Sequence, residues 1–246
     1  MGIDIHQELI NKNIEYWNRK PLLQILYGDF YRLIAENLSN LPERKIVELG
    51  SGLGNIKEFI PDCLRTDLFP NPWIDQVENA YRLSFADESV SDLIMTDVFH
   101  HLKYPGQALL EFHRALRTGG RVIMLEPAIS ALGLVVYGAL HNEPIGVTRK
   151  IEWLAPEYWS AEDIDYYAAQ GNATRVFLGN NFRTELKIWR RVETIRLSAL
   201  AYAASGGYSG PQLYPKSILM LIKGLEKLLD LFPHLFATRL LIILEK

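Results

Sequence analysis

A strand-like segment that ends in glycines is the part of this sequence best suited to binding a ligand. Lys45–Leu49 is a short run of β-forming residues, and Gly50, Gly52 and Gly54 follow it at alternate positions. Glycines after a buried strand let the backbone turn sharply and approach a ligand closely, and the helix that follows offers unpaired amides at its start. The segment therefore predicts a turn against which a nucleotide-like ligand rests.

The spacing of these glycines argues against a dinucleotide cofactor. The dinucleotide fingerprint is Gly-x-Gly-x-x-Gly, whereas here the third glycine is Gly54 and Asn55 stands where the last glycine is expected. A nicotinamide oxidoreductase is therefore the least favoured interpretation of the turn.

Three histidines are candidates for contact with a substrate. Asp97, His100 and His101 come at the end of an apolar strand over residues 91–98, and ligands of open α/β sheets bind beyond the carboxyl ends of the strands. A histidine there is a candidate general base, although a structural role in packing or hydrogen bonding is the favoured alternative. His141 lies beside Glu143 in a later segment and is a candidate acceptor contact, but Pro144 favours a simple polar turn.

The same residues do not predict a metal site. His100 and His101 are neighbours rather than partners at the i, i+4 spacing of a helical metal site. The single cysteine, Cys63, has no partner with which to form a ligand pair. We therefore predict no metal.

These side chains have to be positioned by alternating strands and helices. Apolar residues at helical spacing predict two helices within residues 9–38, interrupted at Pro21. From residue 45 to residue 127, apolar strand-like runs alternate with helical patterns, which is typical of a parallel sheet covered on both faces. The predicted strands cover residues 45–49, 63–67, 76–77, 91–98 and 121–126, and the predicted helices cover residues 55–60 and 106–116, the latter stopped by residues 118–120.

After Pro127 this alternation stops. The next segment mixes aromatic residues with prolines and acids and contains no repeat, so we interpret it as an insertion that covers the site. Its apolar start, residues 128–140, is too short to span a membrane and predicts a buried helix, with a lipid-facing or acceptor-facing surface as the alternative. Two late strands, at residues 186–200 and 238–244, enclose an amphipathic helix over residues 216–231.

We therefore expect one α/β domain with four parts. These are N-terminal helices (1–44), the ligand-binding core (45–127), an insertion or acceptor lid (128–184) and the C-terminal completion of the same core (185–246). A basic run in the last part is expected to lie on a solvated face, with an anionic acceptor site as the alternative. It consists of Lys187, Arg190, Arg191 and Arg196.

The glycine motif carries a family resemblance. Glu48-x-Gly50-x-Gly52-x-Gly54 resembles the S-adenosylmethionine (SAM) signature of the class I, Rossmann-like methyltransferases, and in particular methyltransferase type 11. The similarity continues in register from Lys45 to Pro127. It implies a mostly parallel seven-stranded sheet with helices on both faces, an antiparallel last strand and SAM as the cofactor.

The resemblance also implies which residues hold the cofactor. In the family, an acid at the end of the second strand holds the ribose hydroxyls, and a polar and a small residue after the third strand meet the adenine. The residues that match this pattern, together with the turn, the position after the acid and the end of the fourth strand, are Glu48, Gly50, Ser51, Gly52, Gly54, Asp67, Leu68, Asn79, Ala80 and Asp97.

Physical chemistry supports these roles and leaves alternatives for three of them. A carboxylate can accept two hydrogen bonds from a ribose diol, and a carboxylate near a sulfonium stabilises its charge. Asp67 could instead be a solvated turn acid, Glu48 could bond loop amides, and Asn79 could be a simple turn residue.

The resemblance thus implies a SAM-dependent methyltransferase (EC 2.1.1.-). SAM carries an activated methyl group, so the protein has to orient the acceptor, and a general base is optional. Residues 125–127 and 141–144 are loosely similar to a bacterial subgroup associated with surface-glycan or lipid pathways, which suggests a small-molecule acceptor of that kind. The alternative is a non-catalytic SAM-binding partner or regulatory protein, and turnover of SAM separates the two.

Composition limits the partners. The formal net charge of −3 and the pI of about 6.1 provide no field that would gather phosphates, so a long nucleic-acid partner is not expected. Residues 1–10 lack a signal-peptide pattern and one cysteine excludes an intrachain disulfide, so we expect a cytoplasmic protein without a transmembrane segment. Peripheral contact with a membrane remains open, and the oligomeric state is not predicted.

Overall fold

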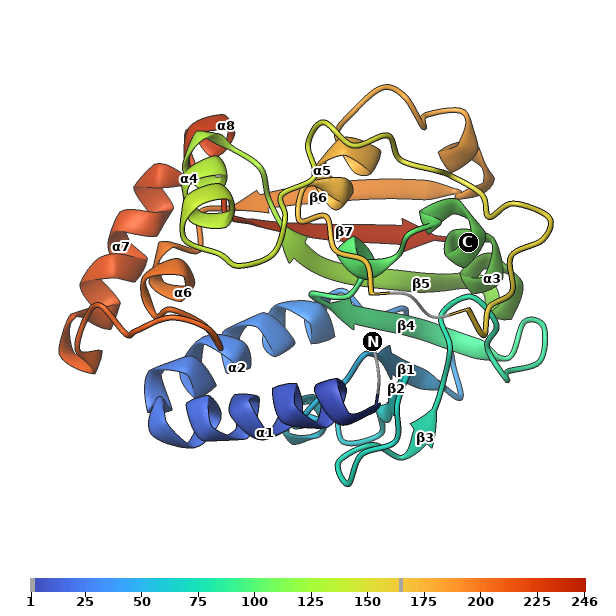
Figure 1. Cartoon of the computed structure of the whole chain (residues 1–246), viewed down its shortest axis with the longest axis horizontal. Helices are drawn as coiled ribbons and strands as arrows, with labels where there is room; N and C mark the ends of the chain where they lie inside the picture. Colours follow the sequence, from blue (N-terminus) through green and yellow to red (C-terminus); the bar gives the residue numbers. More distant parts are fainter. Residues whose placement is uncertain (1–2, 164–165) are drawn as a thin grey trace.

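A seven-stranded sheet forms the centre of the molecule (Figure 1), in a computed structural model that describes residues 3–163 and 166–246. The strand order is β3-β2-β1-β4-β5-β7-β6, and β7 runs antiparallel to both of its neighbours while the other neighbouring strands are parallel. The predicted fold class is confirmed. The strands are β1 (Ile46–Leu49), β2 (Leu64–Asp67), β3 (Gln76–Val77), β4 (Val90–Thr96), β5 (Leu116–Pro127), β6 (Arg191–Leu197) and β7 (Arg239–Glu245).

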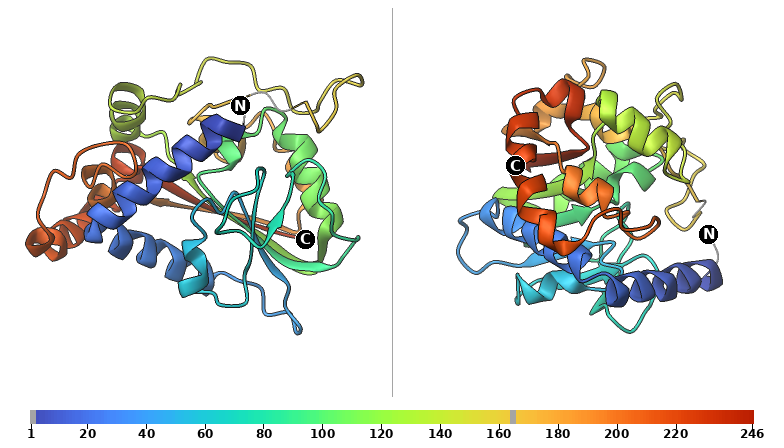
Figure 2. Two further views of the ribbon diagram at one scale, coloured as in Figure 1. Left: turned by 60° about the horizontal axis from the view of Figure 1, so that its bottom comes forward. Right: turned by 90° about the vertical axis from the view of Figure 1, so that its left-hand side faces the viewer.

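Helices lie on both faces of the sheet (Figure 2). Apart from short 3₁₀ turns, they are α1 (Ile3–Arg19), α2 (Pro21–Glu36), α3 (Pro105–Ala115), α4 (Ala131–Ala139), α5 (Asn172–Phe177), α6 (Leu200–Ala204), α7 (Leu219–Leu229) and α8 (Pro233–Phe236). Pro21 is the first residue of α2, where the missing amide hydrogen costs no helical bond. The two predicted N-terminal helices are therefore confirmed.

Side-chain alternation along the central strands builds a core on each face. Leu240, Ile242 and Leu244 of β7 pack in one cluster with residues of α3 and α5, and Leu241 and Ile243 pack in the other with residues of α2. Because successive side chains of a strand point to opposite faces, an almost wholly apolar strand is buried on both sides. This double burial holds the strand ends, and hence the site, in place.

Several predicted elements differ in type or length. Residues 55–58 form a single 3₁₀ turn (η1) rather than the α-helix expected over residues 55–60; Gly54, in the left-handed conformation, precedes the turn and Phe59 follows it. Residues 118–120 belong to β5 rather than stopping a helix, since α3 already ends at Ala115. The predicted strand over residues 186–200 is a 3₁₀ turn (η3, Glu185–Ile188), the shorter β6 and the start of α6.

The apolar segment after β5 is not buried. It forms α4, in which Gly133 and Tyr137 are buried while Leu134 and Val135 are about half exposed, so the buried-helix interpretation is wrong. The amphipathic helix predicted over residues 216–231 is present as a 3₁₀ turn (η4, Lys216–Ile218) followed by α7. No helix of the described residues is long and apolar enough to cross a membrane.

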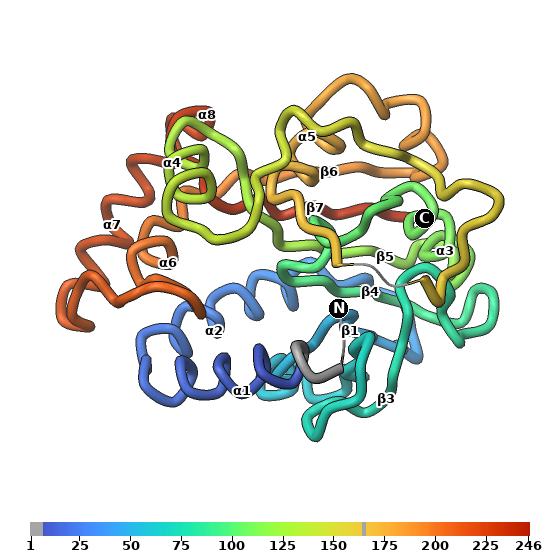
Figure 3. Tube along the Cα trace, viewed as in Figure 1, coloured from blue at the N-terminus to red at the C-terminus, as the bar shows by residue number. Residues whose placement is uncertain are grey.

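Beyond α4 the chain leaves the regular layers. Figure 3 follows it from α4 to the opposite side of the view and back to α5, with little helix and no strand in the described part. Several hydrogen bonds tie this segment to the core; in two of them Ala169 donates its amide to the His100 carbonyl at 3.0 Å, and the Asn79 side chain donates to the Ala161 carbonyl at 2.7 Å. This segment between α4 and α5, described over residues 140–163 and 166–171 and called the covering segment below, therefore lies against the ends of the central strands.

Candidate active site

The glycine turn adopts a backbone that only glycine tolerates easily. Gly50, Gly52 and Gly54 all have positive φ angles, of 70°, 53° and 66°. A Cβ atom on Gly50 would lie 2.4 Å from Val98 Cγ2, so the turn touches the segment that leads from β4 to the histidines. A Cβ on Gly52 would meet only Ile10 Cδ1, at 3.9 Å, so the space above this residue is open.

Ser51 holds the turn to the neighbouring strand. Its amide donates to the Thr66 carbonyl at 2.8 Å, and its hydroxyl accepts from the Thr66 amide at 3.2 Å and donates to the Glu48 carbonyl at 3.3 Å. These bonds serve the backbone rather than a ligand. Ser51 therefore shapes the turn.

Glu48 is a buried acid with an unused oxygen. The residue is 2% exposed, and its Oε2 has no hydrogen-bond partner among the described residues. Burial raises the pKa of the carboxyl to about 7, and the nearby Asp67 charge adds to this, while a hydrogen bond with Ser51 opposes it. An unpartnered buried carboxylate oxygen beside an open glycine turn fits a cationic or hydrogen-bonding ligand.

Asp67 lies at the end of β2, directly across from the turn. Its Oδ2 accepts the Gly52 amide at 2.9 Å and its Oδ1 accepts the Leu68 amide at 2.7 Å. The residue is buried, so it is not a solvated turn acid. Each carboxylate oxygen has two lone pairs, and the carboxylate can therefore hold the turn and still accept bonds from a ligand.

Asn79 and Ala80 follow β3, as expected. The Asn79 side chain accepts the Tyr81 amide at 2.9 Å, the bond of a local turn, and donates to Ala161 of the segment after β5. Ala80 is half-buried and packs on the core. The described contacts of Asn79 are those of a turn residue that also anchors the covering segment.

Asp97 has a partner that sequence reasoning missed. Its two carboxylate oxygens accept from Arg239 Nη1 at 2.5 Å and Nη2 at 3.0 Å, and its φ angle is +59°. Arg239 comes from β7 and is 1% exposed. The Asp97 carboxylate therefore forms an ion pair with a buried arginine, so contact with a ligand is not its only role.

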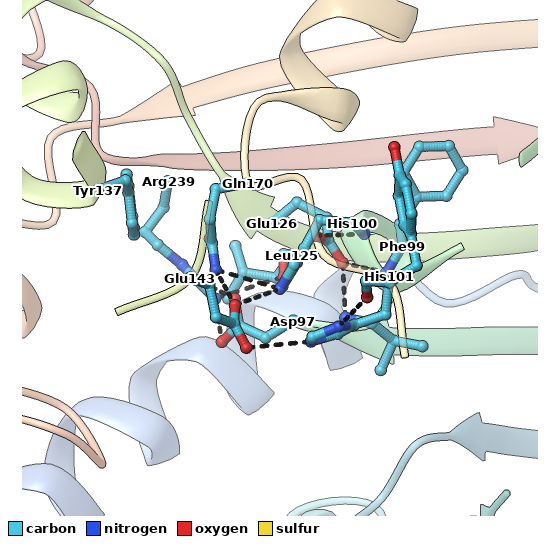
Figure 4. A network of polar contacts seen from close by, with 12 residues as sticks. Asp97, Phe99, His100, His101, Leu125, Glu126, Tyr137, Glu143, Gln170 and Arg239 are labelled. Carbon is cyan, nitrogen blue, oxygen red and sulfur yellow. Dashed lines mark hydrogen bonds and ion pairs between the residues drawn. The ribbon is translucent and has the colours of Figure 1, made fainter. Parts of the chain in front are cut away.

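A second missed acid organises the histidines (Figure 4). Glu126, at the end of β5, is fully buried, and its Oε1 accepts the amides of Val98 and Phe99 at 2.8 and 2.7 Å. Its Oε2 accepts from the His100 ring Nδ1 at 2.7 Å. The sequence signal that could have identified Glu126 as a site residue was its position as an acid at the carboxyl end of a central strand, next to β4.

Glu143 joins both histidines from the covering segment. Its Oε2 is 3.4 Å from His100 Nε2, and its Oε1 is 3.7 Å from His101 Nε2 and accepts from the Tyr166 hydroxyl at 2.9 Å. Gln170 also donates to Glu143 and lies 3.3 Å from His100 Nε2. The structure thus brings together residues separated by more than 40 positions in the chain.

The two histidines differ in protonation. Burial would lower the pKa of His100, but the charge of Glu126 and the hydrogen bonds to Glu126 and Glu143 outweigh it and raise that pKa to about 10. Burial and the charge of His100 lower the pKa of His101. The Glu143 pKa falls to about 2, because hydrogen bonding to His100 and both histidine charges outweigh the burial that would raise it. His100 is therefore a charged partner of carboxylates rather than a free base.

His141 is not part of this cluster in the described contacts. Its Nδ1 accepts the Glu143 amide at 3.2 Å, and its ring lies 6.0 Å from that of Tyr137. The favoured interpretation, a polar turn before Pro144, agrees with these contacts.

Two residues of the basic run lie on a solvated face. Arg190 pairs with Glu245 and Arg191 pairs with Glu193, and both arginine side chains are largely exposed.

The chain is similar to a methyltransferase domain in sequence and to solved methyltransferases in structure. Residues 48–124 match the family model of a methyltransferase domain. No curated protein matches the chain. A SAM-dependent methyltransferase of Thermotoga maritima is 14% identical with a TM-score of 0.54, covering 97% of this chain and 99% of that one. One from Archaeoglobus fulgidus is also 14% identical, with a TM-score of 0.51, covering 91% of this chain and 94% of that one.

A third similar structure was solved with the cofactor. A geranyl diphosphate methyltransferase in complex with SAM is 12% identical, with a TM-score of 0.50, covering 88% of this chain and 84% of that one. At these identities the likeness shows the fold alone, which is that of Rossmann-like methyltransferases. The match of residues 48–124 to a methyltransferase domain supports SAM as the cofactor.

Proposed function

We propose that this protein is a SAM-dependent methyltransferase that acts on a small-molecule acceptor, with a lipid or glycan intermediate as the substrate class. The observation that carries the proposal is the pairing of the open turn at Gly52 with the buried Asp67 carboxylate, which accepts the Gly52 amide. A glycine turn after β1 beside an acid at the end of β2 suits a ligand with a sugar diol.

The residues of this site fit the cofactor. The unpartnered Glu48 Oε2 and the space above Gly52 are features that a bound ligand would use. The cofactor supplies a methyl group on a positively charged sulfur. A buried carboxyl with a pKa near 7 loses its proton easily when a positive charge binds nearby. Glu48 is therefore suited to become negatively charged when the cofactor binds. Asp67 is assigned to the ribose, and Asn79 and Ala80 to the adenine side.

Of the three candidate histidines, His101 best fits contact with the acceptor. Its Nδ1 donates to the Tyr167 carbonyl at 2.9 Å, which fixes the ring, and about a third of its side chain is exposed. His100 is buried with both ring nitrogens engaged, and His141 lies in a separate turn. Orientation of the acceptor is the main catalytic requirement of methyl transfer, and a residue fixed in this way meets it.

The contacts of the covering segment support a role for this segment as the lid over the acceptor. Glu143, Ala161 and Gln170 all belong to it and all contact residues at the ends of the sheet strands. A segment tied to the site by a few polar bonds can exclude water from the reacting groups. We therefore propose that residues 128–184 close over the acceptor.

An exposed apolar helix face favours a lipid over a glycan. Met220, Leu221, Leu228 and Leu231 on and beside α7 are 76%, 75%, 62% and 70% exposed. Lys216, in the 3₁₀ turn before this helix, and Lys227 of the helix are also exposed. Apolar side chains beside lysines are typical of helices that lie in the surface of a membrane with anionic lipids.

The proposal is tested in two steps. Calorimetry with SAM and, as a control, with NADH measures cofactor choice; we expect binding of SAM only. Conversion of SAM to S-adenosylhomocysteine is then measured with panels of lipid and glycan acceptors. Binding of NADH rather than SAM would exclude a methyltransferase. SAM binding without turnover on any acceptor would favour the alternative of a non-catalytic SAM-binding partner.

A further inference from the structure

A cluster of three side chains beside the proposed cofactor site has the composition of a metal site. One ligand atom from each of His100, His101 and Glu143 can be chosen so that all three lie within 4.8 Å of one another. His100 Nε2 lies 3.4 Å from Glu143 Oε2, and His101 Nε2 lies 3.7 Å from the other oxygen, Oε1. Ligand atoms around a tetrahedral Zn²⁺ with bonds of about 2.0–2.2 Å lie about 3.4 Å apart. We infer that these residues bind one divalent transition metal of the Zn²⁺ class.

The orientation of both rings supports this inference. His100 Nδ1 faces Glu126 Oε2 at 2.7 Å, and His101 Nδ1 faces the Tyr167 carbonyl at 2.9 Å. A carboxylate and a carbonyl only accept hydrogen bonds, so each Nδ1 carries the hydrogen. In the metal-free protein the charged His100 ring also carries a proton on Nε2, and metal binding releases this proton. The lone pairs that then bind the metal are on the two Nε2 atoms, which both face Glu143. Metal-binding histidines are typically oriented in this way, by an acceptor on the other ring nitrogen.

The charges around the cluster also favour a cation. Glu126 and Glu143 bring two carboxylates to the histidines, and no lysine or arginine in residues 3–163 and 166–246 forms a salt bridge with either. Asp97 is nearby but is paired with Arg239. A lone pair of His101 facing a carboxylate is repulsive, and a cation between the two atoms would make both contacts favourable.

Gln170 adds an independent observation. It is 2% exposed, its Nε2 contacts His100 and Glu143, and its Oε1 has no partner among the described residues. A buried amide oxygen without a donor is uncommon in a folded protein. A water molecule on a metal at the cluster is a donor of the kind that this oxygen lacks.

The ligand set suggests a metal with open positions. Two imidazoles and one carboxylate are three protein ligands, the number found in catalytic rather than structural zinc sites. Glu126 is not a fourth ligand, because its oxygens already accept the amides of Val98 and Phe99 and the His100 ring. On the proposed function, an acceptor oxygen would take an open position, and His101 would then meet the acceptor through the metal rather than as a base.

The test measures metal binding directly, without turnover. Tag-free protein, freed of metal by a chelator and dialysed, is titrated with Co²⁺ while the visible absorption of the bound ion is recorded, and Zn²⁺ is then added in competition. Glu143→Gln and His101→Asn remove one ligand each. His234→Asn, an exposed histidine of α8, is the matched control. Circular dichroism and thermal melting show whether each variant is folded.

We expect one Co²⁺ per chain, displaced by Zn²⁺, with affinity at least tenfold weaker in Glu143→Gln and His101→Asn and unchanged in His234→Asn. Glu126→Gln should weaken binding by about 10–100-fold, as loss of the group that orients a ligand does. Absence of a Co²⁺ absorption change in the wild-type protein would overturn the inference, as would equal affinity of the wild-type protein and the ligand variants. Because SAM calorimetry is separate, failure of the proposed function is distinguishable from failure of the metal site.

Discussion

Arg239 and Asp97 join the antiparallel strand β7 to the residue that follows β4. The guanidinium donates to both carboxylate oxygens, at 2.5 and 3.0 Å, and also lies over the rings of Phe30 and Tyr202 at 5.5 and 5.1 Å. This ion pair is buried on the arginine side and holds Asp97 in a left-handed conformation. The late strand of the chain therefore helps to position the loop that carries the histidines.

Breaking this pair should be costly. Asp97→Asn alone should lower the free energy of unfolding by about 3–5 kcal/mol, because it leaves the buried Arg239 charge without its partner. Arg239→Met should cost less, because the Asp97 side chain that it leaves unpaired is 28% exposed. The double variant should lose much less than the sum of the two. Urea unfolding of the four proteins measures this coupling, and additive losses would show that the pair does not stabilise the fold.

Gly52→Val should prevent SAM binding while leaving the chain folded. The Cβ atom of the added side chain meets only Ile10 Cδ1, at 3.9 Å, and the side chain would occupy the open space above the turn. The φ angle of +53° adds backbone strain of about 1–2 kcal/mol. Gly119→Val is the matched control, since Gly119 has a φ of +79°, is also uncrowded and lies in β5 away from the turn. Equal SAM affinity of the two variants by calorimetry would argue against the proposed site.

Asp67→Ala should weaken SAM binding by about 1–3 kcal/mol through loss of charge-assisted hydrogen bonds. It should also loosen the turn, because the Gly52 and Leu68 amides lose their acceptor. Asp62→Ala removes an exposed carboxylate from the loop before β2 and should change neither property. SAM affinity that is the same in both variants contradicts the assignment of Asp67 to the ribose.

Glu48 should make stability depend on pH. Because burial raises its pKa from 4.5 to about 7, the folded protein holds a proton that the unfolded chain releases between these two values. Stability should therefore fall by up to about 3 kcal/mol as pH rises from about 4.5 to 7, and then change no further from this group. The positive charge of Arg65 opposes the shift and the negative charge of Asp67 reinforces it.

The comparison with Glu48→Gln isolates this contribution. The variant has no proton to lose, so its stability relative to the wild-type protein should rise from pH 5 to pH 8. Urea unfolding at the two pH values measures the difference. A constant difference between the two proteins would show that Glu48 is already ionised at pH 5 in the folded state.

The exposed face of α7 should bind lipid. Vesicles of phosphatidylcholine with phosphatidylglycerol should co-sediment with the wild-type protein, and Leu221→Glu/Leu228→Glu should abolish this because the charges oppose insertion. Leu110→Glu is the control, at a position of α3 that is 47% exposed. Wild-type protein that stays in the supernatant would remove the support for a lipid acceptor.

Local patterns predicted most of the sheet and the turn. The runs at β1, β4, β7 and the second half of β5 are apolar enough to be recognised one by one, and Gly50, Gly52 and Gly54 have the conformations that their residue type permits. Both features depend on residues within a few positions of one another. For the same reason the type of a short element, such as the 3₁₀ turn over residues 55–58, was harder to predict, since a single turn has almost no periodicity.

The residues around the histidines show where this kind of reasoning ends. Glu48 was identified from the glycine motif and Asp67 from its place at the end of the second strand in the family resemblance. The partner of Asp97, by contrast, is 142 positions away, and Glu143 reaches the histidines from a segment with no regular pattern. The exposure of α4 also depends on what packs against it, which its apolar composition does not reveal. Composition and spacing determine which backbone shapes and chemical groups this chain has. The tertiary structure alone decides which of those groups meet: the sheet closes in the order β5-β7-β6, and the covering segment packs over it. The reason is that contacts between distant residues depend on how whole elements pack, not on which residues are adjacent in the chain.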